Sequence, residues 1–240
     1  MGYNVINANL PVGVFDSGVG GLTVLRELKK RLPFETFLYL GDNANMPYGN
    51  KRENELLRLV SSKLETFMRY KVKALVIACN TLSVRLIDKI KGYPFEVFGV
   101  YPPVYENRTE KVLLLATKAT AVKYKSDDFF TVFPCESLAA DIERNVYNLN
   151  KVNLKKHFTH LTGERFDAVV LGCTHYVLIE KEISKFFNAK TLSGNKATAK
   201  SLKNYLYKNS LTAKNTNPET LFLGGSADKN RKVYDKIRLF

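Results

Sequence analysis

The chain has 240 residues, 45% of them hydrophobic and 25% charged, which is enough apolar material for one large domain or two small ones. It contains no run of about 18 uncharged apolar residues, so we expect no membrane span. Residues 1–11 lack the basic and apolar regions of a signal peptide, which predicts a cytoplasmic protein.

The net charge of +14 comes from 37 basic and 23 acidic residues. The lysines are scattered over many expected elements, with no arginine-rich helix and no basic cluster interleaved with aromatic residues. This scatter favours a lysine-rich solvated surface over a nucleic-acid-binding site, although such a surface also attracts anionic substrates. Cys79, Cys135 and Cys173 lack the spacing of a disulfide framework or a zinc site, so we expect free thiols and no metal.

Apolar patterns predict strands that alternate with helices along the whole chain. The first series has strand patterns at residues 12–16, 37–41, 74–78 and 95–100 and helical spacings at residues 22–32, 52–70 and 84–90. Pro102 and Pro103 then mark a lobe boundary. The second series has strands at residues 111–116, 167–172 and 188–192, helices at residues 138–149 and 177–187, and a closing helix, strand and helix around residues 202–206, 220–223 and 233–237. The alternation predicts an α/β fold of parallel sheets with helices on both faces.

Two segments look like copies of each other. Residues 74–81 read ALVIACNT and residues 168–175 read AVVLGCTH, so each is an apolar strand pattern that ends in a cysteine and small polar residues. One cysteine in such a place is usually a small core residue. Two in matched contexts, Cys79 and Cys173, predict a pseudo-symmetric site with one thiol on each side. Two bases that face opposite sides of one carbon can racemise or epimerise it. Cys135 has no matching repeat and is interpreted as structural.

Polar residues follow several of the expected strands, at the edge where parallel α/β sheets bind ligands. Asp16 either caps a helix or acts with the thiols, and the strand-end cysteines favour the second role. His175 is either a capping or core histidine, or it holds a proton beside Cys173. The glycine-rich residues 13–21 fit neither nucleotide-binding pattern, which favours a tight turn whose backbone amides lie near a carboxylate.

Four motifs together resemble the cofactor-independent glutamate racemases of the aspartate/glutamate racemase superfamily. They are GVFDSGVGGLT at residues 13–23, GDNANMPYG at 41–49, ACNT at 78–81 and LGCTHY at 171–176. The Gly-Cys-Thr-His form is similar to the glutamate branch rather than the aspartate branch. The resemblance implies two pseudo-symmetric parallel-sheet lobes around an active-site cleft, with residues 1–98 and 211–240 in the first lobe and residues 99–210 in the second.

The resemblance also implies roles for residues at the cleft and the absence of a cofactor. Cys79 and Cys173 would be the two acid/base residues, with Asp16 beside Cys79 and with His175 and Glu143 beside Cys173. The residues implied in substrate binding are Ser17, Asp42, Pro47, Tyr48, Gly49, Asn80, Thr81, Thr117, Thr120 and Thr174. The substrate would be glutamate, the product D-glutamate would serve peptidoglycan synthesis, and a homodimer is left open.

The chain departs from the family pattern at several places. Asn43 stands where the family usually has Thr or Ser, and Leu192 stands where an acidic residue is common. The segments after Val100 and after Thr120 are short, so the second lobe is expected to be trimmed.

Three other functions stay open at this point. The first is racemisation of aspartate or of another acidic amino acid. The second is a catalytically silent homologue that binds an acidic amino acid, which the trimmed second lobe favours. The third is a basic nucleic-acid-binding protein.

Overall fold

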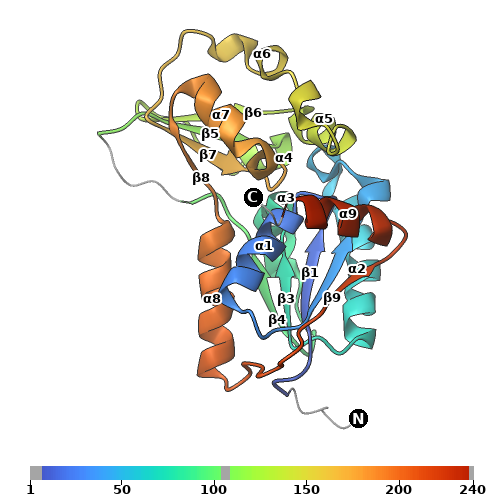
Figure 1. The fold of residues 1–240 in the computed structure, drawn as a ribbon. Coiled ribbons are helices and arrows are strands. Elements are labelled where there is room, and N and C mark those ends of the chain that lie inside the picture. The colour runs from blue at the N-terminus through green and yellow to red at the C-terminus, as the bar shows by residue number, and fades with distance from the viewer. Residues whose placement is uncertain (1–6, 104–108, 238–240) are drawn as a thin grey trace.

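The computed structural model describes residues 7–103 and 109–237, so the ends of the expected first lobe and residues 104–108 of the expected second lobe lie outside the described residues. These residues form two sheets, each entirely parallel, with helices packed on them (Figure 1). The first sheet has five strands in the order β4-β3-β1-β2-β9, and the second has four in the order β6-β5-β7-β8. The expected α/β fold with two parallel-sheet lobes is confirmed.

The elements of the first lobe are β1 (Val12–Asp16), α1 (Leu22–Arg31), β2 (Phe37–Gly41), α2 (Glu53–Arg69), β3 (Ala74–Ile77), α3 (Asn80–Leu86), β4 (Glu96–Gly99), α8 (Asn195–Lys208), β9 (Thr220–Leu223) and α9 (Ala227–Ile237). Those of the second lobe are β5 (Val112–Ala116), α4 (Lys118–Ala121), β6 (Phe130–Pro134), α5 (Leu138–Arg144), α6 (Leu154–His157), β7 (Ala168–Gly172), α7 (Glu180–Phe187) and β8 (Lys190–Leu192). Short 3-10 helices are η1 (Asn43–Asn45), η2 (Tyr48–Asn50), η3 (Ile87–Lys89), η4 (Leu149–Lys151), η5 (Thr159–Leu161) and η6 (Tyr176–Ile179).

The first sheet is buried on both faces because successive strand residues point to opposite sides. In β3, Ala74 and Val76 join the core under α1, α8 and α9, whereas Leu75 and Ile77 join the core under α2 and α3. Continuous apolar runs therefore give this sheet two cores and fix its strands in the middle of the lobe.

The second lobe is less evenly covered. One face of its sheet packs on a core that includes residues of α5 and α7, such as Leu138 and Ile183. The other face has a small core of buried residues. Among the residues that the structure describes, this core receives one buried residue from a helix, Ala121 of the four-residue helix α4. This face of the second sheet is therefore thinly covered in the described residues.

Three elements differ from the expectations. Helix α8 lies in the range expected for the second lobe, but it packs against α1 and β4, because Ala199, Leu202 and Leu206 belong to the first lobe's core. The edge strand β6 was not expected. It is half-buried and ends in Pro134, and its sequence, FTVFP, is not a continuous apolar run. The helix expected over residues 138–149 ends at Arg144, and Leu149 lies in η4.

The chain crosses between the lobes twice, and the crossings touch. The first leaves β4 and the second enters α8. A Cβ atom on Gly194 would lie 2.0 Å from the backbone oxygen of Tyr101, so only glycine fits at this contact. The Thr198 hydroxyl also donates to the backbone oxygen of Gly99 at 3.0 Å. The two crossings therefore form one packed hinge.

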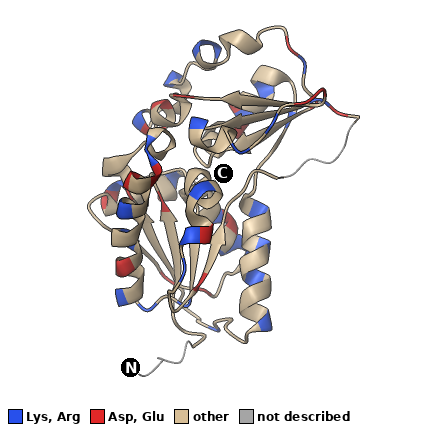
Figure 2. Ribbon diagram, turned by 180° about the vertical axis from the view of Figure 1, so that it is seen from behind, with Lys and Arg blue, Asp and Glu red and all other residues tan. Residues whose placement is uncertain are grey.

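Basic residues are distributed over helices and connecting segments of both lobes (Figure 2). In the described ranges, no helix is both long enough and apolar enough to cross a membrane.

The hinge contact leads to a stability prediction. Gly194→Ala should lower the free energy of unfolding by about 1–3 kcal/mol, because the new methyl group collides with backbone that cannot rotate away. Urea denaturation measures the difference. Gly225→Ala is the matched control, since a Cβ there meets nothing within 4 Å. An unchanged Gly194→Ala midpoint would mean that the crossings separate easily.

Candidate active site

The two cysteines occupy equivalent places in the two lobes. Cys79 follows β3 and precedes α3, and Cys173 follows β7 and precedes η6. Both side chains are buried, with Cys79 6% and Cys173 7% exposed. Strands β3 and β7 lie inside their sheets rather than at an edge. Because each cysteine closely follows its strand, both thiols lie at the carboxyl ends of parallel strands, where such sheets bind ligands.

A small cavity lies between the lobes and is bordered by both thiols. Its volume is about 20 Å³, which is room for about one water molecule. Its walls are Ser17, Met46, Pro47, Tyr48, Gly49, Asn50, Cys79, Asn80, Thr81, Thr117, Cys135, Glu136, Ala139, Cys173, Thr174 and His175. The structure therefore brings eleven of the fifteen expected site residues to one cavity, and an amino acid needs a wider cleft than this one.

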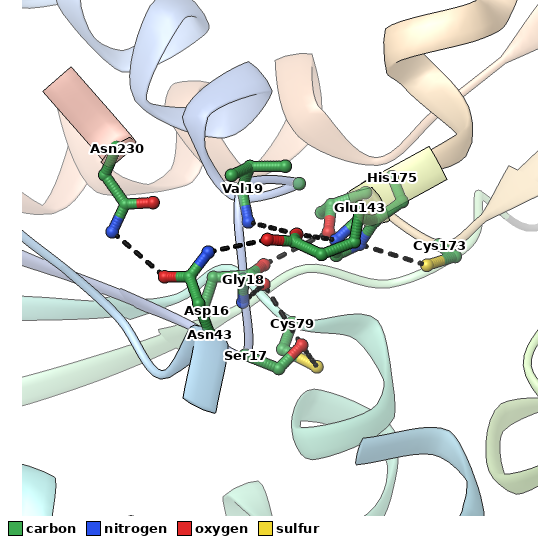
Figure 3. Close-up of polar contacts among 12 residues, drawn as sticks. Asp16, Ser17, Gly18, Val19, Asn43, Cys79, Glu143, Cys173, His175 and Asn230 are labelled. Atoms are coloured by element: carbon green, nitrogen blue, oxygen red, sulfur yellow. Dashed lines mark hydrogen bonds and ion pairs between the residues drawn. The ribbon is translucent and has the colours of Figure 1, made fainter. Parts of the chain in front are cut away.

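A hydrogen-bond chain runs from Cys79 into the first lobe. The Cys79 thiol donates to the Ser17 hydroxyl at 3.8 Å, and this hydroxyl donates to Oδ1 of Asp16 at 3.2 Å (Figure 3). Burial, assisted by the negative charge of Asp16, raises the pKa of Cys79 to about 12. The sulfur on this side is consequently a thiol at neutral pH.

Asp16 is fully buried behind the cavity rather than in its wall. The backbone amide of Gly18 donates to Oδ1 at 2.9 Å, and the Thr174 hydroxyl of the second lobe donates to Oδ2 at 3.1 Å. Burial raises the pKa of Asp16, and the nearby His175 and these hydrogen bonds oppose that rise. The carboxylate is thus held by both lobes.

A second chain runs from Cys173 through His175 to Glu143. Sγ of Cys173 lies 3.9 Å from Nδ1 of His175, and Nε2 of His175 lies 2.9 Å from Oε2 of Glu143 (Figure 3). Burial lowers the pKa of His175, but its hydrogen bonds to Cys173 and Glu143 and the charges of these groups outweigh burial and raise the pKa to about 10. The imidazole is therefore protonated at neutral pH and donates from both nitrogens.

Glu143 accepts hydrogen bonds from four donors, three of them in the first lobe. Besides His175, these are the backbone amide of Val19 at 2.9 Å, Nδ2 of Asn43 at 2.7 Å and Nζ of Lys229 at 2.5 Å. Burial raises the pKa of Glu143, but the hydrogen bond and positive charge of His175, followed by the hydrogen bonds from Lys229 and the Val19 amide, hold the pKa well below its usual range. Four donors and no acceptor fit only the ionised carboxylate.

The glycine-rich turn after β1 is shaped by side chains of the other lobe. A Cβ on Gly18 would lie 2.5 Å from Oε2 of Glu143, and one on Gly20 would lie 2.5 Å from Nδ1 of His175. The amides of Gly18 and Val19 donate to the carboxylates of Asp16 and Glu143. The turn therefore fits the expectation of backbone amides next to a carboxylate, and its glycines make room for Glu143 and His175.

Asp42 supports the cavity wall from behind. Its carboxylate accepts from the Tyr48 hydroxyl at 2.6 Å and from Nδ2 of Asn45 at 3.0 Å, and Lys63 lies 3.4 Å away. Burial and the hydrogen bond to Asp42 raise the pKa of Tyr48. With these contacts satisfied, Asp42 fixes Tyr48 and does not itself line the cavity.

The expected threonines form a contact between the lobes. The hydroxyls of Thr81 and Thr117 lie 2.9 Å apart, and the Thr117 hydroxyl donates to Thr120 at 3.2 Å. Thr120 is fully buried and lies outside the cavity wall. Nδ2 of the Asn80 side chain donates to the backbone oxygen of Val100 at 3.1 Å. This contact connects the start of α3 to the hinge.

The sequence analysis missed several residues of this region. Cys135, interpreted as structural, lines the cavity, as do Met46, Asn50, Glu136 and Ala139. Val19, Asn43 and Lys229 hold Glu143. Val19 and Asn43 lie in two of the quoted motifs but were given no role, and no local pattern indicated Lys229. Among the residues that the structure describes, no group of three or more His, Cys, Asp or Glu is placed to hold a metal ion.

We compared the chain with protein-family models, with curated proteins and with solved structures. No protein-family model matches it, whereas curated proteins and solved structures do. The glutamate racemase of Clostridium novyi is 33% identical, with 93% of this chain and 94% of that protein aligned, and the one of Clostridium acetobutylicum is 36% identical, with 83% and 85% aligned.

Solved structures agree with the sequence relatives. A glutamate racemase from Bacillus anthracis matches with a TM-score of 0.82 and 28% identity over 98% of this chain and 96% of that one. Glutamate racemases from Francisella tularensis, in complex with D-glutamate, and from Escherichia coli, in complex with L-glutamate and the activator UDP-MurNAc-ala, each match with a TM-score of 0.77 and 26% identity. They cover 97% and 94% of this chain and 95% and 94% of their own. The chain belongs to the glutamate racemase family.

Proposed function

We propose that this protein is a cofactor-independent racemase that interconverts L- and D-glutamate and supplies D-glutamate for peptidoglycan in the cytoplasm. The observation that carries the proposal is the pair of buried thiols, Cys79 and Cys173, which border one cavity from opposite lobes. Each is backed by its own chain to a carboxylate. Solved relatives that hold L- or D-glutamate support the choice of substrate.

In the proposed reaction, one cysteine removes the α-proton as a thiolate and the other delivers a proton to the opposite face as a thiol. Cys79, with its raised pKa, starts as the thiol. Cys173, whose Sγ lies 3.9 Å from Nδ1 of His175, is the sulfur proposed to take the α-proton in this direction. In the opposite direction the two sulfurs exchange these roles.

The polar wall of the cavity is proposed to bind the two carboxylates and the amino group of the substrate. The wall carries hydroxyl and side-chain amide groups of Ser17, Tyr48, Asn80, Thr81, Thr117 and Thr174, which hydrogen-bond within the protein in this structure. Backbone at Pro47 and Gly49 closes one side, while Asp42 and Thr120 fix Tyr48 and Thr117 from behind. Donors fixed in advance stabilise the carboxylate as it gains charge on loss of the α-proton.

The substrate is the first point to test. Among glutamate, aspartate, glutamine and alanine, glutamate should be racemised fastest, without added pyridoxal phosphate, because the Gly-Cys-Thr-His motif resembles the glutamate branch. Circular dichroism of each pure enantiomer measures the rate. Faster turnover of aspartate would favour a racemase of another acidic amino acid, and binding of glutamate without turnover would favour a silent homologue. Activity lost on EDTA dialysis and restored by a metal would also contradict the proposal.

The two-thiol mechanism predicts that Cys79→Ser and Cys173→Ser each lower racemisation by at least about 10²-fold, because a hydroxyl is too weak a base at neutral pH. With a β-substituted glutamate analogue, a single remaining thiolate can still take the α-proton while the β-substituent leaves as an anion and a carbon–carbon double bond forms. Each variant should then process one enantiomer, and the two variants opposite ones, as chiral chromatography would show.

Cys135→Ser is the control for general loss of a thiol, and it should keep most of the activity. If Cys79→Ser or Cys173→Ser kept near-normal racemisation, the two-base mechanism would be wrong for this chain.

Asp16→Asn separates a role in proton transfer from a role in folding. Its amide oxygen can still accept from the Gly18 amide, and the Thr174 hydroxyl can turn to accept from the new amide group, so the loss of stability should stay within about 1 kcal/mol. Turnover should fall at least about 10-fold, because the charge behind Ser17 and Cys79 is removed. Thermal melting and kinetics on the same variant decide, and unchanged kinetics would leave Asp16 as a structural residue.

A further inference from the structure

Lys229 makes a contact between the lobes that the proposed mechanism does not yet use. It lies on α9, which belongs to the first lobe through β9, and its Nζ donates to Oε1 of Glu143 in α5 of the second lobe at 2.5 Å. The Lys229 side chain is 34% exposed and that of Glu143 is 10% exposed, so the pair is partly shielded from water. Helix α9 reaches the cleft in this way although it contributes no residue to the cavity wall.

The two oxygens of Glu143 have different partners. Oε1 accepts from Lys229 and from Asn43. Asn43 in turn accepts from Nδ2 of Asn230 at 3.2 Å (Figure 3). Oε2 accepts from the Val19 amide and lies against Nε2 of His175. Both oxygens thus attach Glu143 to the first lobe, and Oε2 also orients the imidazole that contacts Cys173.

A glutamate side chain has three rotatable torsions, so an orienting carboxylate needs its second oxygen fixed. A charge-assisted hydrogen bond from an ammonium fixes it more strongly than the neutral amide of Asn43 does. Misplacement of a reacting group by about 1 Å can cost about 10²-fold in rate. The position of the Lys229 ammonium therefore bears on the geometry at Cys173.

We propose that Lys229 is a positioning residue, whose ammonium holds Glu143 across the cleft so that Glu143 orients His175 beside Cys173. The inference rests on the proposed racemase activity for its kinetic test, and on the structure alone for its spectroscopic one. It gives the C-terminal helix a part in the reaction that no local sequence motif indicates.

The kinetic test compares Lys229→Met, Lys229→Arg and Lys232→Met in both directions of racemisation. Lys229→Met should lower kcat at least about 10-fold, with KM within about threefold of wild type, and Lys229→Arg should recover part of the loss because it keeps the cation. Lys232→Met is the matched control: it removes the same charge from an exposed position on α9 for which the described residues offer no ion pair or hydrogen bond. Lys229→Gln substitutes for Lys229→Met should the latter fail to fold.

The inference is overturned if Lys229→Met keeps kcat within about twofold of wild type, if Lys229→Arg falls as far as Lys229→Met, or if Lys232→Met falls equally far. A double-mutant cycle adds a check. In a Glu143→Gln background, the change at Lys229 should cost nothing further, because its partner's charge is already gone.

The second readout does not need activity. The chain has three histidines, His157, His160 and His175, so their ring-nitrogen NMR shifts can be followed separately. Lys229→Met should move the shifts of His175 alone, and Lys229→Arg should move them less. If His175 is unchanged, Lys229 does not position it, whatever the kinetics. A wild-type protein that fails to racemise glutamate would contradict the proposed function, while the NMR result would still decide the role of Lys229.

Discussion

Each lobe buries one carboxylate at the cleft and relies on the opposite lobe for part of its hydrogen bonding. Asp16 of the first lobe accepts from the Thr174 hydroxyl of the second, and Glu143 of the second accepts from Val19, Asn43 and Lys229 of the first. A buried charge without partners is costly, so both carboxylates favour the closed arrangement. The reciprocal exchange explains why two separate sheets form one site.

The closeness of the lobes accounts for features that a single lobe would not require. Gly18 and Gly20 lie where a side chain would collide with Glu143 and His175, and the facing hydroxyls of Thr81 and Thr117 also meet across the cleft. The remaining cavity has a volume of about 20 Å³. The contacts that complete the site are the same ones that close it, and substrate entry must break some of them.

The two halves of the site are alike in backbone and different in chemistry. Cys79 is backed by the Ser17 hydroxyl and the buried carboxylate of Asp16. Burial, assisted by the charge of Asp16, raises the pKa of Cys79 to about 12. Cys173 lies beside His175, whose pKa is raised to about 10 by its hydrogen bonds despite burial. Repeated strands thus supply equivalent positions, and different residues lie behind the two sulfurs. The proposed two-base reaction needs the sulfurs to differ in role, because one has to act as a base while the other acts as an acid.

The amino-acid sequence by itself determined every described strand except β6, most helices, the two strand-end cysteines and the polar residues beside them, because apolar periods and motifs are local. It did not determine that α8 packs on the first lobe, since an amphipathic face shows that a helix is packed but not on which sheet. Nor could it pair Glu143 with Asn43 and Lys229, which lie 100 and 86 positions away in the chain. Those contacts exist only once the lobes meet, so the tertiary structure decided which groups hold the carboxylates.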